Sequence, residues 1–443
     1  MRIAMKPQNI FVLTVISFLC SPIFAENPCD RKVVMKAVDF PGNYKEDGFW
    51  AGMNVASDGK VYIGLNTEGG GHGHFYVYDP AKGQIKHIAD TVKFLGESGQ
   101  GTRTQSKIHS KFCEDKDGNI YFSTGNMRSG PETVDPMSWK GGHWCKYIPK
   151  SGKLEDLGPI DPFGGIYGMT IDKKRNLLFG TSETGHFMLY DISTGRTTDL
   201  GRVAYDASSV ARTLICDDEG NVYGSFIPDR IFKYDAKSGR LLDLTLRIPS
   251  DVEVYPMTHS IYSRLLRVGV WDDETKKIYA LEGVTSILFQ FDPKAGKEGE
   301  IKTLDRLLPP QKSEEIKKSH YASLSFTLGK DRKIYYMPVG SMDSDACNEG
   351  VDFFDWTGQP YLITYDLKTG KKECLGRIFT DSGERVIDHL NAAPSGGATT
   401  GPDGTIYFCD FVEEKNPDLV ARYTGKIPGR LKLLIYKPQE ANK

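Results

Sequence analysis

Histidine, tyrosine and arginine residues stand at matching places in the first half of this sequence. His109 lies in "SKIHSKF", Tyr167 in "GGIYGMT" and Arg212 in "SVARTLI", and a short stretch of strand-like residues follows each of them. Histidine titrates close to neutrality and can move a proton, whereas arginine fixes an anion through a two-pronged hydrogen bond. This combination of residue types suits proton transfer beside a carboxylate.

The elements that carry these residues belong to a repeat with two alternating phrases. The first is a tight turn that feeds a strand, as in "SDGKVYIG", and its seven copies are marked by Tyr62, Tyr121, Leu178, Tyr223, Tyr279, Tyr335 and Tyr407. The second is an aromatic residue followed, usually, by Asp and a turn glycine, as in "YDAKSG", with copies at Tyr78, Tyr147, Tyr190, Tyr234, Phe291 and Tyr365 and a partial one at Tyr436. Each unit holds four strands, and the spacing of about 45 to 70 residues suits propeller blades.

The fold class follows from these units. Apolar and polar residues alternate within them, which favours strands over helices. The last unit lacks its fourth strand, and residues 32–40 ("KVVMKAVDF") form an orphan strand near the other terminus. Pairing the two would remove two exposed edges. We therefore predict an all-β fold, a single seven-bladed β-propeller over residues 26–443 with four-stranded blades, closed by pairing of the N- and C-terminal strands. Six blades with a divergent appendage is the alternative.

The repeat also predicts where the nine histidines lie. In a propeller, the connections from an outer strand to the next inner strand and the loops between the second and third strands emerge on one face. Eight histidines fall in or beside such connections: His72, His74, His109, His143, His186, His259, His320 and His389. His87 alone falls within an outer strand, so we expect it to lie apart from the others. The simpler interpretation is that these polar groups satisfy buried backbone at the mouth of the channel.

Arginine and aromatic residues extend the same face. Arg264 and Arg267 in "YSRLLRVG" add cations, whereas Trp144 and Trp356 lie in long loops and offer rings on which a sugar could stack. The alternative for each tryptophan is that it packs its own loop. The substrate-binding candidates are thus His72, His74, His143, His186, Arg264, Arg267, His320, Trp144 and Trp356.

The sequence leaves any cofactor unknown. The acidic run from Asp343 to Asp355 fails the EF-hand spacing for Ca²⁺, so a solvated loop is the better interpretation. His72, His74 and His143 are zinc-type ligands, but their spacing does not select a metal. A divalent ion, calcium or zinc, stays open.

Composition narrows the classes of partner and the compartment. The net charge of -2 gives no basic field for nucleic acid. Residues 1–25 place Arg2 and Lys6 before an apolar run too short to span a membrane, which is the layout of a signal peptide and predicts a secreted or periplasmic protein. Lipid attachment at Cys20 is the alternative. The chain has eight cysteines and no CxxC, so we expect most to be buried apolar residues, with one or two disulfides possible.

With these features the chain resembles the seven-bladed propeller polysaccharide lyases of the ulvan and oligogalacturonate lyase type. The resemblance rests on architecture and residue types. It implies that His109 is the base that removes the C5 proton of a uronate, Tyr167 the acid or second proton carrier, and Arg212 the clamp on the carboxylate. The implied partner is an acidic poly- or oligosaccharide, bound by a monomer.

Two other classes remain open at this point. A non-catalytic propeller that binds glycan or protein would use the aromatic residues and would not require His109. A lactonase-type hydrolase would hold Ca²⁺ with carboxylates and amides at the mouth of the channel, where this sequence has His, Tyr and Arg instead.

Overall fold

The structure is a computed structural model. It describes residues 31–67, 71–97, 104–125, 139, 141–162, 164–205, 210–227, 229–250, 265–283, 286–307, 323–338, 357–389, 397–420 and 429–438. The predicted signal peptide therefore lies outside the described residues. So do Arg264, His259, His320, Trp356 and the acidic run.

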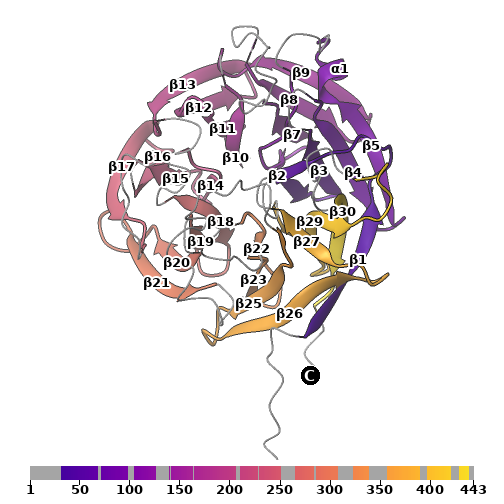
Figure 1. Cartoon of the computed structure of the whole chain (residues 1–443). Coiled ribbons are helices and arrows are strands. Elements are labelled where there is room, and N and C mark those ends of the chain that lie inside the picture. The colour runs from indigo at the N-terminus through magenta and orange to yellow at the C-terminus, as the bar shows by residue number, and fades with distance from the viewer. Residues whose placement is uncertain are drawn as a thin grey trace, which may run out of the picture.

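Five blades are separate four-stranded antiparallel sheets, arranged in a ring with the first strand of each innermost (Figure 1). Blade one contains β2 (Gly48–Val55), β3 (Val61–Asn66), β4 (His74–Asp79) and β5 (Gln84–Asp90). Blade two contains β6 (Cys113–Glu114), β7 (Ile120–Ser123), β8 (His143–Ile148) and β9 (Lys153–Pro159). Blade three contains β10 (Ile166–Asp172), β11 (Leu177–Ser182), β12 (His186–Asp191) and β13 (Arg196–Arg202).

Blades four and five follow the same plan. Blade four contains β14 (Ile215–Cys216), β15 (Val222–Phe226), β16 (Arg230–Asp235) and β17 (Arg240–Arg247). Blade five contains β18 (Leu266–Asp272), β19 (Lys277–Glu282), β20 (Ile287–Asp292) and β21 (Glu300–Arg306). The short helix α1 (Thr91–Phe94) follows β5 and is capped by the Asp90 carboxylate, which accepts hydrogen bonds from the Val92 and Lys93 amides.

Blades six and seven share one ten-stranded sheet. Blade six contains β22 (Phe326–Leu328), β23 (Lys333–Tyr336), β25 (Tyr361–Asp366) and β26 (Lys372–Thr380). Blade seven contains β28 (Thr399–Thr400), β29 (Ile406–Glu413), β30 (Gly429–Tyr436) and β1 (Lys32–Asp39), and β27 (Val386–His389) pairs with the far end of β29 and with β24 (Thr357–Gly358). The prediction of seven four-stranded blades is confirmed.

The N-terminal strand β1 closes the ring by pairing with two different strands. Its second half pairs antiparallel with β30, from Lys36 opposite Ile435 to Asp39 opposite Lys432, so the predicted closure is confirmed. Its first half pairs in parallel with β26, from Lys32 opposite Arg377 to Met35 opposite Thr380, which the sequence did not indicate. In Figure 1 the indigo strand β1 accordingly lies between orange β26 and yellow β30. One strand thus ties blade six to blade seven.

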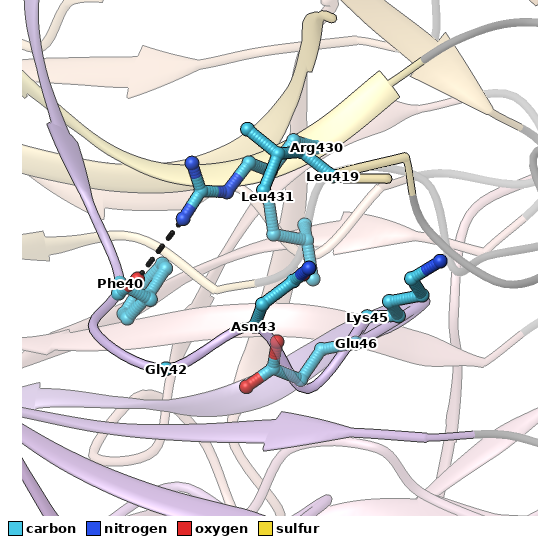
Figure 2. A pocket seen from close by; sticks show the side chains of 8 residues that line it. All are labelled: Phe40, Gly42, Asn43, Lys45, Glu46, Leu419, Arg430 and Leu431. Atoms are coloured by element: carbon cyan, nitrogen blue, oxygen red, sulfur yellow. Dashed lines mark hydrogen bonds between the residues drawn. The ribbon is translucent and has the colours of Figure 1, made fainter. Parts of the chain in front are cut away.

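The segment after β1 forms a small polar pocket beside this closure. Figure 2 shows Arg430 donating a hydrogen bond to the Phe40 carbonyl at 3.2 Å, with Asn43 and Glu46 nearby. The amide of Asn43 also donates to the Asp418 carbonyl at 2.7 Å. The free volume of the pocket is about 10 Å³, roughly the space of one water molecule. These contacts fasten the chain between its closing strand and the start of blade one.

A recurring aspartate explains why the first phrase of the repeat makes a turn. Asp217 accepts hydrogen bonds from the Glu219 and Asn221 amides and, at 3.1 Å, from the Tyr223 hydroxyl. The carboxylates of Asp58, Asp115 and Asp331 accept the hydroxyls of Tyr62, Tyr121 and Tyr335 in the same way. Each carboxylate replaces the missing backbone partners of its turn and anchors the following strand.

Turn geometry is kept even where the glycine is lost. Gly220 has a φ of 86°, in the left-handed region that glycine enters without strain. In blades three, five and six, Asn176, Lys276 and Arg332 adopt the left-handed conformation instead, with φ of 56°, 57° and 66°. Such backbone is uncommon outside glycine, so the flanking strand pairs must hold it.

Cysteine and helix content complete the description. Cys113, Cys145, Cys216 and Cys409 are free, and Cys374 belongs to a disulfide. Across the described ranges, no helix has the length and apolar character needed to cross a membrane.

Candidate functional site

Four side chains from consecutive blades stack against one another near the points where the inner strands begin. Trp50 lies in β2, His109 just before β6, Tyr167 in β10 and Arg212 just before β14. The rings of Trp50 and His109 are stacked with centroids 4.8 Å apart, and those of His109 and Tyr167 meet edge to face at 4.4 Å. The Arg212 guanidinium carbon lies 3.9 Å from the centre of the Tyr167 ring. We call these four residues the inner arc.

Local sequence sets this close approach. Gly168 follows Tyr167, and a Cβ at this position would lie 2.9 Å from the Ala211 carbonyl, so only glycine lets the two inner strands approach at that level. On the other side, the Asn66 side-chain carbonyl accepts a hydrogen bond from the Ile108 amide at 2.9 Å and fixes the backbone next to His109. The inner arc is therefore held by a close backbone approach between blades three and four and by a hydrogen bond between blades one and two.

The inner arc is buried and surrounded by cations. His109, Tyr167 and Arg212 are 2%, 0% and 4% exposed. Lys107 and Arg267 are equally buried, and the Lys107 ammonium lies 5.6 Å from the centre of the Trp50 ring. Buried cations are costly unless an anion or hydrogen-bond acceptor meets them. Two nitrogen atoms of Arg212 meet no acceptor among the described residues, so this side chain indicates a place for negative charge.

The tautomer of His109 follows from its one hydrogen bond. Its Nδ1 lies 3.3 Å from the backbone carbonyl of Tyr167. A carbonyl only accepts, so Nδ1 carries the hydrogen and the lone pair of the neutral ring is on Nε2. That Nε2 is buried and has no hydrogen-bond partner within the described part of the chain.

Burial holds the His109 pKa well below its ordinary value of 6.5, and the positive charges of Arg212, Lys107 and Arg267 lower it further. Only the hydrogen bond to the Tyr167 carbonyl acts in the other direction. The imidazole is therefore neutral at physiological pH, which is the form that can accept a proton.

Arg212 has spare hydrogen-bonding capacity. Its Nε and Nη1 are buried and meet no hydrogen-bond acceptor among the residues that the structure describes. A buried polar group without a partner costs about 1–3 kcal/mol, and more when charged. A carboxylate bound side-on would satisfy both nitrogen atoms.

Three other candidate histidines lie outside the inner arc and pair with aspartates instead. His143 opens β8 and its Nδ1 lies 2.8 Å from Asp156 on β9, whereas His186 opens β12 and lies 2.7 Å from Asp199 on β13. His72 pairs with Asp90 at 2.7 Å. Blade four has Arg230 and Asp243 in the same arrangement, at 2.6 Å. The pairs of His143, His186 and Arg230 join the third strand of a blade to the fourth, whereas His72 lies just before the third strand of blade one.

His74 and His87 form a separate cluster, which corrects the expectation that His87 lies apart. His74 Nδ1 is 3.2 Å from His87 Nε2, and the Tyr44 ring stacks on His74 with centroids 4.2 Å apart. Burial lowers the His74 pKa to about 3 and also lowers that of His87. Both side chains are therefore neutral in the folded protein near neutral pH.

The structure also corrects the expected role of Trp144. We expected it to offer a ring to a sugar, but its side chain is 0% exposed and packs between blades two and three, near Tyr190. It has no accessible face on which a ligand could stack. It follows His143 on β8, and successive strand residues point to opposite faces, so the strand pattern already favoured an inward position.

Sequence reasoning missed Trp50 and Lys107. A signal for Trp50 was present, because it precedes the turn tyrosine Tyr62 at the same spacing as His109 precedes Tyr121. Lys107 carried no comparable signal, since its contact with Trp50 crosses from one blade to the next.

No model of a known protein family matches the chain, and no curated protein matches it in sequence. Solved structures do match in fold. A fungal alcohol oxidase of the AA5 family, in complex with copper, has a TM-score of 0.55 at 14% identity over 93% of this chain and 78% of that one. A chain of the mitotic checkpoint complex reaches 0.54 at 10% identity, covering 93% of this chain and 96% of its own. The WD40 repeats of RRP9 reach 0.54 at 10% identity, covering 91% and 98%.

At these identities the matches show the β-propeller fold alone. Within the described ranges, no group of three His, Cys, Asp or Glu side chains is placed to hold a metal ion. His72, His74 and His143, the candidate metal ligands, are engaged by Asp90, His87 and Asp156.

Proposed function

We propose that this protein is a secreted or periplasmic polysaccharide lyase that cleaves uronate-containing glycans by β-elimination at the inner arc. One observation carries the proposal: a buried, neutral histidine with its lone pair on Nε2 shares the inner arc with a buried arginine that has two unsatisfied nitrogen atoms. A base beside an anion clamp is what abstraction of a proton next to a carboxylate requires.

The proposed steps assign one task to each residue. His109 Nε2 takes the C5 proton of the uronate, and the electron pair of that C–H bond forms the C4=C5 double bond. The bond from C4 to the leaving oxygen breaks, and this oxygen takes a proton from the Tyr167 hydroxyl. Arg212 pairs with the carboxylate, onto which negative charge spreads in the transition state. Removing one such donor typically costs about 3–4 kcal/mol in the barrier.

The cations around His109 also give a reason for selecting an anionic substrate. They lower the pKa of the free histidine and so weaken it as a base. A bound carboxylate would offset the charges of Arg212, Lys107 and Arg267. The His109 pKa would then rise, and the base would become stronger when the correct substrate is present.

The burial of the inner arc favours a second candidate, a non-catalytic glycan-binding propeller. Because Tyr167 is fully buried and Arg212 nearly so, the stacked side chains also suit a purely structural centre. In that case the glycan would bind elsewhere on the face and no bond would break.

The test is incubation of the mature protein with a panel of uronate polysaccharides, with and without added divalent metal, while ultraviolet absorbance of the unsaturated product is followed. The lyase proposal predicts a steady rise with at least one polymer. Folded protein that binds a uronate polymer but releases no unsaturated sugar from any of them would establish the binding propeller instead.

A further inference from the structure

A chamber lies in the centre of the ring, next to the inner arc, and residues from all seven blades line it. Its free volume is about 40 Å³, which leaves room for a few water-sized groups. Its walls are mostly apolar and include Met53, Met169, Val268, Leu324 and Phe326. Arg212 lines it together with Lys111, which follows His109 by two residues in the segment that leads into β6.

Lys111 and Arg212 are the two charged side chains among the described residues that line the chamber. Burial lowers the pKa of the Lys111 amine below its ordinary value of 10.5. The one titratable neighbour that acts on it is Cys113, and burial raises the pKa of that thiol to about 12, so the thiol is uncharged. Within the ranges the structure covers, no carboxylate therefore offsets the charge of Lys111.

This setting is the one in which lysine becomes a nucleophile. An amine among apolar walls, with another cation lining the same cavity, loses its proton more readily and can then attack a carbonyl carbon. Arg212 supplies a matching anion site, since its Nε and Nη1 have no acceptor among the described residues. A ligand that satisfies both groups needs a carboxylate and a carbonyl in one small, otherwise apolar molecule.

We propose that the chamber binds a small oxo acid, whose carboxylate pairs with Arg212 and whose carbonyl carbon forms an imine with Lys111. In this step the Lys111 nitrogen adds to the carbonyl carbon, and the carbonyl oxygen leaves as water with the two hydrogens of the nitrogen. The apolar wall receives the carbon chain and excludes the water that would reverse the reaction. The proposal does not depend on lyase activity, because its readout is a covalent adduct.

The experiment traps the imine on the full mature chain. The protein is incubated at neutral pH with pyruvate, acetoacetate or levulinate, which place the carbonyl at increasing distance from the carboxylate, and sodium cyanoborohydride reduces any imine to a stable amine. Peptide mass spectrometry then locates the adducts. We expect Lys111 to be labelled well before an exposed lysine such as Lys82, whose side chain is 71% exposed.

Matched controls test each half of the ligand. Propanoate, which has the carboxylate but no carbonyl, should protect Lys111 from labelling by pyruvate. Butanone, which has the carbonyl but no charge, should label Lys111 poorly, and Arg212→Met should abolish the advantage of pyruvate over butanone. Lys111→Met should lose the adduct, and Lys111→Arg, which keeps the charge, should lose it too while retaining the unfolding midpoint of the wild type.

Two results would overturn the proposal. One is labelling of Lys111 by all three oxo acids no faster than of Lys82, in protein whose fold is verified by its unfolding curve. The other is protection and binding by propanoate together with no adduct from any oxo acid, which would define a plain anion site.

Discussion

His109 is the proposed base, and it is also a buried group whose pKa responds to the charges around it. The sequence alone did not distinguish these two features. Its residue type and its position before an inner strand were readable from the repeat. The tautomer was not, because it depends on the Tyr167 carbonyl, which a different blade supplies at 3.3 Å. The same holds for Arg212, whose place over the Tyr167 ring depends on the close approach at Gly168.

Substitutions in the inner arc should distinguish the roles of its residues by their effects on kcat and on substrate binding. If the lyase proposal holds, His109→Ala should lower kcat by about 100-fold to 10,000-fold with little change in substrate binding, because a general base acts in the transition state. Arg212→Ala should impair both kcat and binding, since its ion pair forms with the bound substrate. Tyr167→Phe keeps the ring and should lower kcat alone. Steady-state kinetics on the active polymer measures all three.

A structural role for these residues predicts a different pattern. All three variants would then lose stability and glycan binding together, and any activity would fall in proportion to the folded fraction. Val34→Ala, at an exposed position on β1, serves as the neutral control.

Buried histidines should make the fold sensitive to acid. His109, His74 and His87 all have folded-state pKa values below the ordinary value of 6.5, so below about pH 6.5 the unfolded chain binds protons that the folded chain does not. Stability is then full above pH about 6.5 and falls as the pH decreases from there, by up to about 1.4 kcal/mol per pH unit for each histidine. Denaturant titrations at several pH values between 7.5 and 4.5 should show this slope.

Replacing one of these three histidines should flatten the dependence of stability on pH. His74→Gln removes one titrating group and should reduce the loss of stability between neutral pH and pH 4.5. A slope identical to that of the wild type would mean that His74 is not buried in its neutral form in solution.

At the scale of the element, turns were easier to predict than inner strands. The "SDGKVYIG" phrase worked because Asp and Gly act locally: the carboxylate and the left-handed residue make the turn regardless of what surrounds it. Inner strands β6, β14 and β28 are only two residues long, so they are too short to show an alternating pattern. They are strands because the neighbouring strand of the same blade fixes them.

The histidine–aspartate pairs of blades two and three have a sequence signal that our sequence analysis did not use. His143 and Asp156 are 13 residues apart, and so are His186 and Asp199. The third and fourth strands of a blade meet at a tight turn, so a constant spacing across that turn indicates a cross-strand pair rather than a shared ligand site. This spacing explains why His143 and His186 each pair within their own blade.

Strand β1 offers a matched pair of positions with opposite burial. Met35 is fully buried in the core between blades six and seven, whereas the adjacent Val34 is 58% exposed. Met35→Ala should destabilise the protein by about 2–5 kcal/mol, because it leaves a cavity, and Val34→Ala should change stability by less than about 0.5 kcal/mol. Urea unfolding of the two variants measures the difference. Equal effects would contradict the burial pattern of β1.

At the scale of the whole molecule, the ring closes through one strand with two partners. A ring closed only by β30 and β1 would leave blade six to meet blade seven through side chains. Here residues 32–35 continue the sheet of blade six and residues 36–39 complete blade seven, so β1 removes the exposed edges of both. Sequence predicted the antiparallel half because the last repeat lacked a strand. It could not predict the parallel half, because the unit containing β26 already had its four strands.

Removal of β1 should therefore cost more than the loss of a single edge strand. A chain that starts after Phe40 loses both pairings of β1 and the buried side chains Val33 and Met35, and it exposes β26 and β30 together. We expect a sharply lower unfolding midpoint and a tendency to aggregate through the exposed edges. A truncation that starts at Lys32, which keeps the whole strand, is the control and should match the mature protein. Adding the peptide of residues 31–40 in trans should recover part of the lost stability, because it can pair with both edges again. If the chain starting after Phe40 instead keeps the midpoint of the control, the ring does not depend on this strand and the closure described here is not what holds blades six and seven together.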